Sequence, residues 1–258
     1  MKKRTTRITE NQFWVLLDVI RQFATPPTGT GRPIRLTLEQ QVRLCIMSLR
    51  KNITQEFLGE IFHLSQPTVS RTIGRLTPLL AWLLRVYLLD PEAASKGTTL
   101  LVDGTLMPCW SWADHQELYS GKHKTTGHNI QVASDLDPRL VYLSAPLAGS
   151  THDAEAVRQL DLPGMLTSVR TGNAIGDKGY QGSGIITPKK KPRGQDMTDH
   201  QKANNKPIHQ LRATIERVIA NVKTWRTLHT DYRRPVETFE DTLDAIRGLI
   251  FFQLATAL

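Results

Sequence analysis

Apolar residues spaced at helical intervals predict that the first third of the chain is helical. Within residues 8–24 the residues that follow this spacing are Phe13, Leu16, Leu17 and Ile20. Residues 25–33 are rich in proline and glycine, which predicts a loop. The helical pattern resumes after Thr37, a residue suited to cap a helix, and continues to about residue 89. We therefore expect an all-helical domain over residues 1–92.

The second part of the chain has the pattern of short strands. Residues 98–103 form an apolar run, and residues 129–134 alternate between polar and apolar positions. Residues 140–144 follow a turn signal, so these three runs together predict a β-meander. A separate short run at residues 173–177 predicts one more strand.

Helical patterns occur among and after these strands. They cover residues 151–160, about 208–225, and 239–254, and a loop rich in glycine and lysine is expected between residues 178 and 206. Near residues 90–97 the pattern of apolar residues changes from helical spacing to short strand-like runs. We therefore expect an α/β protein whose second domain covers residues 97–258.

The charge of the chain narrows the choice of partners. Its formal net charge is +9 and its calculated pI is about 9.7, so it should attract nucleic acids or anionic membrane surfaces. The most apolar tract, residues 249–254, is far shorter than the roughly 20 residues that span a bilayer. The basic residues 1–4 are followed by polar residues, so no secretion signal is expected. These features favour nucleic acid and disfavour a membrane partner.

The chain has two cysteines, Cys45 and Cys109. They form no Cys-x-x-Cys pair, and a structural zinc site needs about four well-spaced ligands. A disulfide framework is also not indicated. Ordinary thiols fit a reducing compartment, and we expect a cytoplasmic protein.

Residues 54–73 have the form of a helix-turn-helix. Thr54 can cap the first helix, whose buried face would hold Leu58, Ile61 and Phe62. Ser65 can accept a hydrogen bond from the backbone that opens the second helix, and Pro67 lies in its first turn.

The second helix leaves a set of polar residues on its outer face and edges. Polar side chains at the start of a recognition helix can reach base edges or phosphates. The alternative is an ordinary helical hairpin with a solvated face, but the motif and the basic charge favour DNA binding. The candidate DNA-binding residues are Gln66, Thr68, Ser70, Arg71 and Arg75.

Three carboxylates suggest a catalytic site. Asp103 and Asp177 end two of the predicted strands, and Glu216 lies in the long predicted helix. Cleavage of phosphodiesters commonly uses two divalent cations about 3.5–4 Å apart, and Mg²⁺ prefers hard oxygen ligands. Carboxylates brought together at strand ends would suit that requirement.

The same long helix carries two cations on the face of Glu216. Arg212, Glu216 and Lys223 lie within about 40° of one another around a helix with 3.6 residues per turn. One interpretation is a carboxylate that holds a metal, flanked by cations that hold DNA phosphates. The other is a solvated face with an ion pair from Arg212 to Glu216, and the spacing alone favours this second interpretation.

Five short stretches in the second domain resemble one known family. They match, in order and over residues 40–235, the DDE superfamily of bacterial insertion-sequence transposases, and within it the insertion-sequence-five group related to Harbinger elements. The stretches cover residues 102–105, 119–124, 149–153, 176–180 and 216–226.

The resemblance implies an RNase H-like domain with a mixed sheet. It implies that Asp103, Asp177 and Glu216 are the catalytic residues and metal ligands, and that two Mg²⁺ ions, or Mn²⁺ in their place, are bound. It also implies cleavage of double-stranded DNA at terminal inverted repeats, attack of the freed 3′-hydroxyl on target DNA, and a homodimer or larger assembly. No small-molecule substrate is expected.

The family also carries a Tyr-x-x-Arg-x-x-x-Glu-x-x-x-x-x-x-Lys signature. Arg212, Glu216 and Lys223 match it, which implies DNA contacts for the two cations. The tyrosine position is His209 in this chain. This departure puts a DNA contact at that position in doubt, and leaves the metal ligands unaffected.

Other residues allow two interpretations. Asp153 starts a predicted helix, where it can cap or complement the helix or approach the metals, and we favour the first. The basic run at residues 189–193 is either solvated or in contact with phosphate. Trp110, Trp112 and Trp225 are expected to be core or hinge residues.

Two alternative functions remain at this point. The chain could be a catalytically inactive DNA-binding protein derived from a transposase. It could also be a metal-dependent endonuclease that cuts DNA and never joins ends to a target. Either would show the same motifs.

Overall fold

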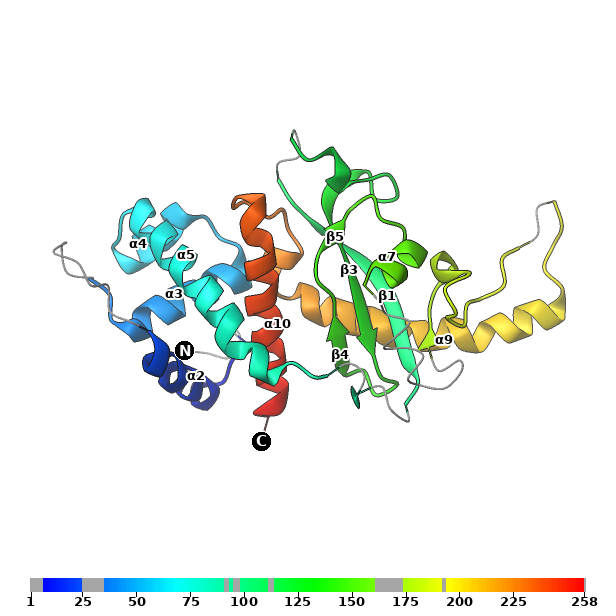
Figure 1. Cartoon of the computed structure of the whole chain (residues 1–258), viewed down its shortest axis with the longest axis horizontal. Coiled ribbons are helices and arrows are strands. Elements are labelled where there is room, and N and C mark those ends of the chain that lie inside the picture. The colour runs from blue at the N-terminus through cyan, green and yellow to red at the C-terminus, as the bar shows by residue number, and fades with distance from the viewer. Residues whose placement is uncertain are drawn as a thin grey trace. The chain divides into compact units, whose positions relative to one another are not determined.

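The computed structural model describes most of the chain, namely residues 7–24, 35–90, 93–94, 98–110, 114–160, 174–191 and 194–257. The chain forms two compact units. The helical unit comprises Met1–Leu88 and Thr224–Leu258, and the sheet unit comprises Leu89–Lys223 (Figure 1). The loop expected at residues 25–33 lies outside the described residues.

The helical unit is built from five α-helices and three short 3-10 helices in the part of the chain that the structure describes. Their bounds are α2 (Glu10–Phe23), α3 (Leu38–Lys51), α4 (Gln55–Phe62), α5 (Gln66–Leu83), η1 (Leu84–Tyr87), η4 (Arg226–Leu228), η5 (Val236–Thr238) and α10 (Phe239–Ala255). The predicted helical character of the first domain is therefore confirmed.

Threonine caps define where three of these helices begin. Thr9 and Thr37 each exchange hydrogen bonds with the glutamine three residues later, which forms a capping box. Thr54 accepts a hydrogen bond from the backbone N–H of Phe57 (3.3 Å). The caps predicted at Thr37 and Thr54 are confirmed.

The turn between α4 and α5 closes on a glycine. The N–H of Leu64 donates to the carbonyl of Gly59 (2.8 Å), and a Cβ at Gly59 would lie 2.6 Å from the Leu64 carbonyl oxygen. Because α4 turns the side that carries Leu58 and Gly59 toward α5, Leu58 is fully buried while Ile61 is 44% exposed. The predicted burial of Ile61 was wrong.

Ser65 marks the start of α5 but does not cap it in the expected way. Its hydroxyl pairs with the hydroxyl of Thr68 (2.9 Å), and no side-chain cap bond to the backbone forms. Pro67 lies in the first turn, as predicted. The core beneath the two helices is formed by Leu36, Leu44, Leu58, Val69 and Ile73.

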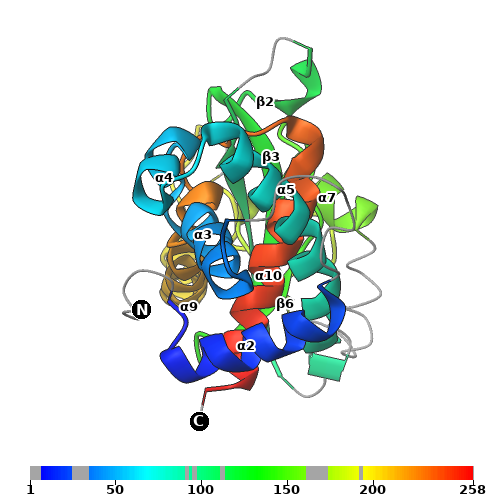
Figure 2. The same ribbon diagram turned by 90° about the vertical axis from the view of Figure 1, so that its left-hand side faces the viewer.

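The C-terminal helix α10 belongs to the helical unit. We expected it within a domain over residues 97–258, and the structure differs because α10 packs against η1 and against α5. Helices α5 and α10 are labelled in Figure 2. A Cβ at Gly248 would overlap the side chain of Leu84, so the glycine allows close packing. Gln12 on α2 also donates to Thr256 just after α10 (3.0 Å).

The sheet unit contains a mixed sheet. Its strands are β1 (Leu100–Pro108), β2 (Tyr119–Ser120), β3 (Thr125–Ser134), β4 (Leu140–Leu143), β5 (Leu147–Ala148) and β6 (Ala174–Ile175). Strand β3 pairs antiparallel with β1 on one side and with β2, β4 and β5 on the other. Strand β6 pairs parallel with β1. The predicted meander and the α/β class are confirmed.

Strand β1 is longer than the apolar run that predicted it. Its pairing with β3 continues in regular register from Leu101 to Pro108, so Asp103 lies within the strand and not at its end. The apolar run stopped at Asp103 because Gly104 and Thr105 interrupt the apolar pattern, although their backbones still pair with β3.

Both α-helices and short 3-10 helices accompany the sheet. They are η2 (Gln116–Leu118), α7 (Asp153–Gln159), η3 (Lys178–Tyr180) and α9 (Asp199–Lys223). Helix α9 begins well before the expected residue 208. Thr198 and Gln201 exchange hydrogen bonds at its start, and Pro207 is accommodated inside it. A buried cluster that includes Val102, Val157 and Tyr180 joins β1 to α7 and η3.

Candidate active site

Asp103 and Asp177 lie at neighbouring strands of the sheet unit. Asp103 is in β1 with its side chain 15% exposed. Asp177 follows β6 and caps η3, where it accepts a hydrogen bond from the N–H of Gly179 (2.6 Å). Because β6 runs parallel to β1, the chain leaves β6 in the direction of Asp103.

The pKa of Asp103 shows that other carboxylates lie close to it. This pKa is raised to about 6, chiefly by burial; Arg212 and the N–H of Gly104 oppose the rise, and the charges of Asp177 and Asp153 add to it. A buried carboxyl beside two like charges is costly to ionise. A cation bound among these groups would offset that cost.

Two glycines leave room for the carboxylates. A Cβ at Gly104 would overlap Asp153 Oδ1. A Cβ at Gly179 would lie 2.8 Å from both Asp153 Oδ2 and Asp177 Oδ1, so these two oxygens are at most twice that distance apart. The glycines therefore form a cradle that any larger residue would fill.

The structure confirms one part of the preferred interpretation of Asp153 and corrects the other: its acidic side chain lies in the first turn of α7, where it complements the helix, but it does not cap the helix. It lies in the first turn of α7, but no side-chain cap bond forms at this helix start, whose N-cap is His152. Instead its side chain is 10% exposed and pairs with Lys122 (Asp153 Oδ2 to Lys122 Nζ, 3.2 Å). Asp153 thus belongs to the acidic cluster formed by Asp103, Asp153 and Asp177.

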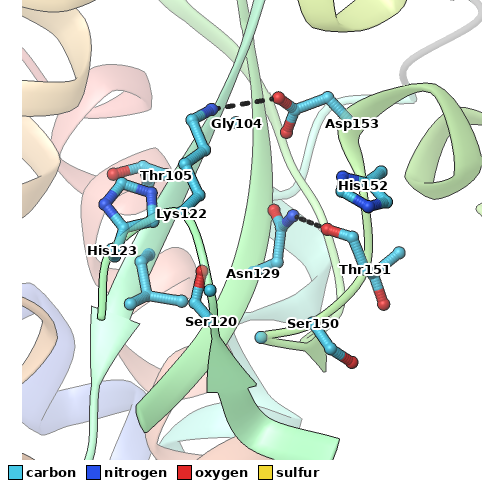
Figure 3. Close-up of a pocket in the computed structure, with 13 residues that line it drawn as sticks. Gly104, Thr105, Ser120, Lys122, His123, Asn129, Ser150, Thr151, His152 and Asp153 are labelled. Carbon is cyan, nitrogen blue, oxygen red and sulfur yellow. Dashed lines mark hydrogen bonds and ion pairs between the residues drawn. The ribbon is translucent and has the colours of Figure 1, made fainter. Parts of the chain in front are cut away.

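A chain of buried hydrogen bonds holds this region in place. Tyr180 O–H donates to Gln131 Oε1 (2.5 Å), and Gln131 Nε2 donates to Asn129 Oδ1 (2.9 Å). Asn129 in turn donates to the carbonyl of Thr151 (2.8 Å), two residues before Asp153 (Figure 3). Burial, and then the three nearby aspartates, raise the pKa of Tyr180 well above its usual range, so it remains a donor.

On α9, Arg212 and Lys223 approach Asp103. Arg212 Nη2 lies 3.9 Å from Asp103 Oδ2, and the Nε of Arg212 is buried with no hydrogen-bond partner among the described residues. Lys223 is half-buried; burial lowers its pKa and the charge of Asp103 opposes that shift. The ion pair considered between Arg212 and Glu216 is absent from the described interactions.

The structure does not bring Glu216 to the two aspartates. It is exposed on α9, roughly a third of a turn from the buried line of Ile215, Val218 and Val222. His209, in the tyrosine position of the family signature, is also exposed. The assignment of Glu216 as a catalytic ligand therefore stays a prediction.

The acidic cluster has the donor chemistry for a divalent cation, but the ligands are not yet arranged around one. Carboxylate oxygens are the ligands that Mg²⁺ and Mn²⁺ prefer. Within the described ranges, no three His, Cys, Asp or Glu side chains are close enough together to hold an ion as they stand. Side-chain movement would be needed to complete a coordination shell.

A pocket of about 250 Å³ adjoins Asp153 (Figure 3). Its walls come from β1, from the turn between β2 and β3, and from the segment before α7. Lys122, His123 and His152 line it, and burial lowers the pKa of His123. The pocket thus places a cationic side chain beside the carboxylates.

The candidate DNA-binding residues of the helical unit lie mostly at the surface. Gln66, Arg71 and Arg75 are exposed, and Thr68 and Ser70 are half-buried. Three of them are held by neighbours within the unit: Gln66 donates to Gln55 (2.6 Å), Arg71 donates to the Pro67 carbonyl (3.1 Å), and Arg75 donates to Gln41.

A second basic element lies beside Gln66. Arg233 and Arg234 line one pocket together with Gln66, although they are far from it in sequence. Two hydrogen bonds anchor the segment that carries these arginines. Asn52 donates to the carbonyl of Asp231 (3.0 Å), and Tyr232 O–H donates to the carbonyl of Thr238 (2.9 Å). Sequence analysis missed these arginines, and the paired basic residues were the available signal.

The remaining candidates have mixed outcomes. Trp225 is fully buried, as expected, but Trp110 is 66% exposed and is not a core residue. Trp112 lies outside the described residues. Of the basic run, residues 189–191 are exposed and Lys191 pairs with Asp196 (2.7 Å), while residues 192–193 lie outside the described residues.

Comparison with known protein families decides the class of this site. Residues 102–250 match the family model of the DDE superfamily endonucleases, and residues 35–85 match the helix-turn-helix of the same superfamily. The chain belongs to the DDE superfamily of endonucleases. Its acidic cluster, within the matched endonuclease range, is therefore the candidate active site of a DDE enzyme, and the two-part layout of a helix-turn-helix region and a mixed-sheet domain is consistent with that fold.

Individual relatives support the same conclusion. The chain is 34% identical over 224 residues to a putative transposase for insertion sequence element IS112 of Streptomyces albus G, and the match covers 86% of this chain and 82% of the relative. It is 26% identical over 263 residues to a probable transposase for insertion sequence element IS702 of Microchaete diplosiphon, with 98% and 94% covered. No solved structure matches. The finer placement in the insertion-sequence-five group stays a prediction.

Among the described residues, no helix is both long enough and apolar enough to cross a bilayer.

Proposed function

We propose that this DDE endonuclease is a transposase that binds the terminal inverted repeats of an insertion sequence, cuts one strand and joins the freed 3′ end to target DNA. The observation that carries the proposal is the acidic cluster within an endonuclease match, joined in one chain to a helix-turn-helix match. The names of both relatives support it. This activity would take place in the cytoplasm of a bacterium.

Asp103 and Asp177, with Glu216, would hold the divalent cations, which we propose to be two Mg²⁺ ions that Mn²⁺ can replace. The chemistry supplied by bound ions is activation of the attacking oxygen and stabilisation of the leaving oxygen. Glu216 is exposed on α9, so it would join the aspartates through a change of its side chain or of the helix. Arg212 and Lys223, close to Asp103, would hold the phosphates of the bound strand.

The helical unit would recognise the DNA. Exposed polar residues at the start of α5 would contact base edges and phosphates, in the manner of a recognition helix. The residues proposed for this role are Gln66, Thr68, Ser70, Arg71 and Arg75. Because two ends of the element must be held together, we propose a homodimer or larger assembly on DNA.

A strand-transfer assay tests this function. Labelled DNA carrying an end of the element that encodes the chain is incubated with a target plasmid in Mg²⁺, in Mn²⁺ and in chelator. We expect cut and joined products that require metal. Asp177→Ala and Glu216→Ala should each reduce them by at least about a hundredfold, since each removes a metal ligand. Asp137→Asn, in an exposed turn of the same unit, is the control.

The other outcomes separate the alternative functions. Cut DNA with no joined product would identify an endonuclease without strand transfer. Specific binding with no cut in either metal would identify a DNA-binding protein, and the catalytic assignment would then be wrong. Loss of activity in Asp177→Ala with full activity in Glu216→Ala would remove Glu216 from the site.

A further inference from the structure

A pocket of about 260 Å³ is lined jointly by the helix-turn-helix and by a segment from the C-terminal part of the chain. The starts of both helices line it, with residues 54–56 from α4 and Gln66 from α5. Arg233 and Arg234 line it from the segment between η4 and η5. All of these residues belong to the helical unit. The pocket thus joins a basic segment to the candidate DNA-binding surface.

The charge of this pocket is positive on balance. The charged residues that line it are Arg233, Arg234 and Glu56. Arg233 and Glu56 are exposed, and Arg234 is half-buried. A guanidinium presents several N–H donors in one plane, which suits the oxygens of a phosphate. An anion of this kind is therefore the ligand that the pocket favours.

The segment that carries the two arginines is held in place on both sides of Arg233. Tyr232, just before it, is buried and packs edge-on against Phe239 (5.1 Å between ring centroids). Arg234, just after it, donates from Nη1 to Thr242 Oγ1 on α10 (3.4 Å). Because this backbone is already ordered, little further entropy is lost when an anion contacts Arg233.

The place of the pocket in the unit indicates which anion it would meet. In a helix-turn-helix the second helix enters the major groove, and the first helix crosses the sugar–phosphate backbone beside it. The pocket lies where both helices start, and there Gln66 donates to Gln55 (2.6 Å). A backbone phosphate at the edge of the groove would therefore lie next to the pocket. Contacts to such phosphates fix the position of a protein on the duplex.

We propose that Arg233 and Arg234 form a second DNA-binding element of the helical unit, which binds a backbone phosphate beside the groove that α5 would enter. This inference rests on the proposed function and adds a contact outside the helix-turn-helix match at residues 35–85. The element would hold DNA of any sequence, whereas the start of α5 would read bases. Glu56, at the same pocket, would limit the affinity because it repels phosphate.

The test is equilibrium binding of the full chain to a fluorescent duplex that carries an element end, measured by anisotropy in chelator between about 50 and 200 mM salt. We expect Arg233→Gln to weaken binding by about three- to tenfold and to reduce the slope of log Kd against log salt by about 1, since one phosphate contact is lost. The loss should be equal on a duplex of scrambled sequence. Arg21→Gln removes the same charge from an exposed position on α2 and is the matched control, which should bind as the unaltered chain does.

A substitution of opposite sign guards against loss of binding through misfolding. Glu56→Gln should strengthen binding to both duplexes by about two- to fivefold, because it removes an exposed like charge beside the phosphate. A misfolded variant would not bind more tightly. An absence of any gain in Glu56→Gln would show that the phosphate does not lie at this pocket, and would overturn the inference.

Two results for Arg233→Gln also overturn the inference. An unchanged affinity and salt slope would mean that Arg233 is a solvated residue. A loss on the element end with no loss on the scrambled duplex would mean a base contact in place of a phosphate contact. The proposed function stands in both cases if the unaltered chain prefers the element end. Equal binding of the unaltered chain to both duplexes would instead contradict the recognition of inverted repeats, while Arg233→Gln would still decide the phosphate contact.

Discussion

His128 is a residue whose protonation opposes the fold. It lies in β3, where Met107 of β1 and Ala148 of β5 are its neighbours across the sheet. Its pKa is lowered to about 4, chiefly by burial and also by the charge of His115, while the Leu147 backbone and Glu117 oppose the shift. The native state therefore favours neutral His128, whereas the unfolded chain protonates it near pH 6.5.

We predict that the sheet unit loses stability as the pH falls from about 6.5 to about 4, by on the order of 1–3 kcal/mol from His128. The stability is fully present above the unfolded pKa and is lost progressively down to the folded one. His128→Gln should flatten this part of the profile of melting temperature against pH. His200→Gln, in an exposed position on α9, should leave the slope unchanged. An identical slope in His128→Gln would contradict the assignment.

At the scale of single residues, the sequence predicted which side chains could carry the chemistry better than it predicted what those side chains contact. Asp103 and Asp177 were identifiable because each ends an apolar run, and the structure brings both into one acidic cluster. Asp153 was assigned to a cap because first-turn acids are common there. Its true surroundings depend on Gly104 and Gly179, which are distant in sequence, so local pattern could not reveal them.

At the scale of elements, the turn of the helix-turn-helix depends on a close backbone approach. Gly59 and Gly74 are both helical, but only Gly59 faces a backbone oxygen, which lies 2.6 Å from the position that a Cβ would take. At Gly74 the same position is 4.0 Å from the nearest atom, the end of Arg234. A substitution at Gly74 is therefore a control for the same substitution at Gly59.

We predict that Gly59→Ala destabilises the helical unit by about 1–3 kcal/mol, because the Leu64 carbonyl must shift. Gly74→Ala should be neutral or stabilise by up to about 1 kcal/mol, since alanine favours helix. Urea unfolding followed by circular dichroism measures both. Equal effects of the two substitutions would show that α4 and α5 do not meet as described.

Element types followed from periodicity, but element ends did not. Caps at Thr37 and Thr54 were visible in the sequence because a threonine precedes each apolar pattern. The start of α9 was placed too late because a loop rich in glycine and lysine was expected to continue to residue 206. Ile61 was expected in the core because spacing alone does not show on which side of Leu58 the partner helix lies.

At the scale of the whole molecule, the helical unit is discontinuous in sequence. The segment from Thr224 onward is tied into it by Arg7, which donates to Thr224 (2.5 Å), and by Asn52, which donates to Thr230 (2.7 Å). Phe252 of α10 also packs edge-on against Tyr87 (5.1 Å between ring centroids). The sequence predicted a helix over residues 239–254, but a helical pattern does not show which element the helix packs against.

We predict that residues 1–92 alone do not form a cooperative fold, because α5 and η1 lose the apolar face of α10. Adding residues 224–257 in trans, or through a short linker, should restore one. The measurement is the dispersion of amide signals in two-dimensional NMR, with the complete chain as the reference. A well-dispersed spectrum from residues 1–92 alone would support the boundaries suggested by sequence.

The central claim, that Asp103 and Asp177 hold the metal that supports DNA cleavage, is tested most directly by a change of ligand chemistry. Mg²⁺ prefers oxygen ligands, whereas Mn²⁺ accepts sulfur more readily. Asp177→Cys should therefore lose cleavage of the element end in Mg²⁺ and recover part of it in Mn²⁺, while Asp177→Ala recovers none. Cleavage that persists in Asp177→Ala, or no difference between the two metals in Asp177→Cys, would contradict a metal contact at this residue.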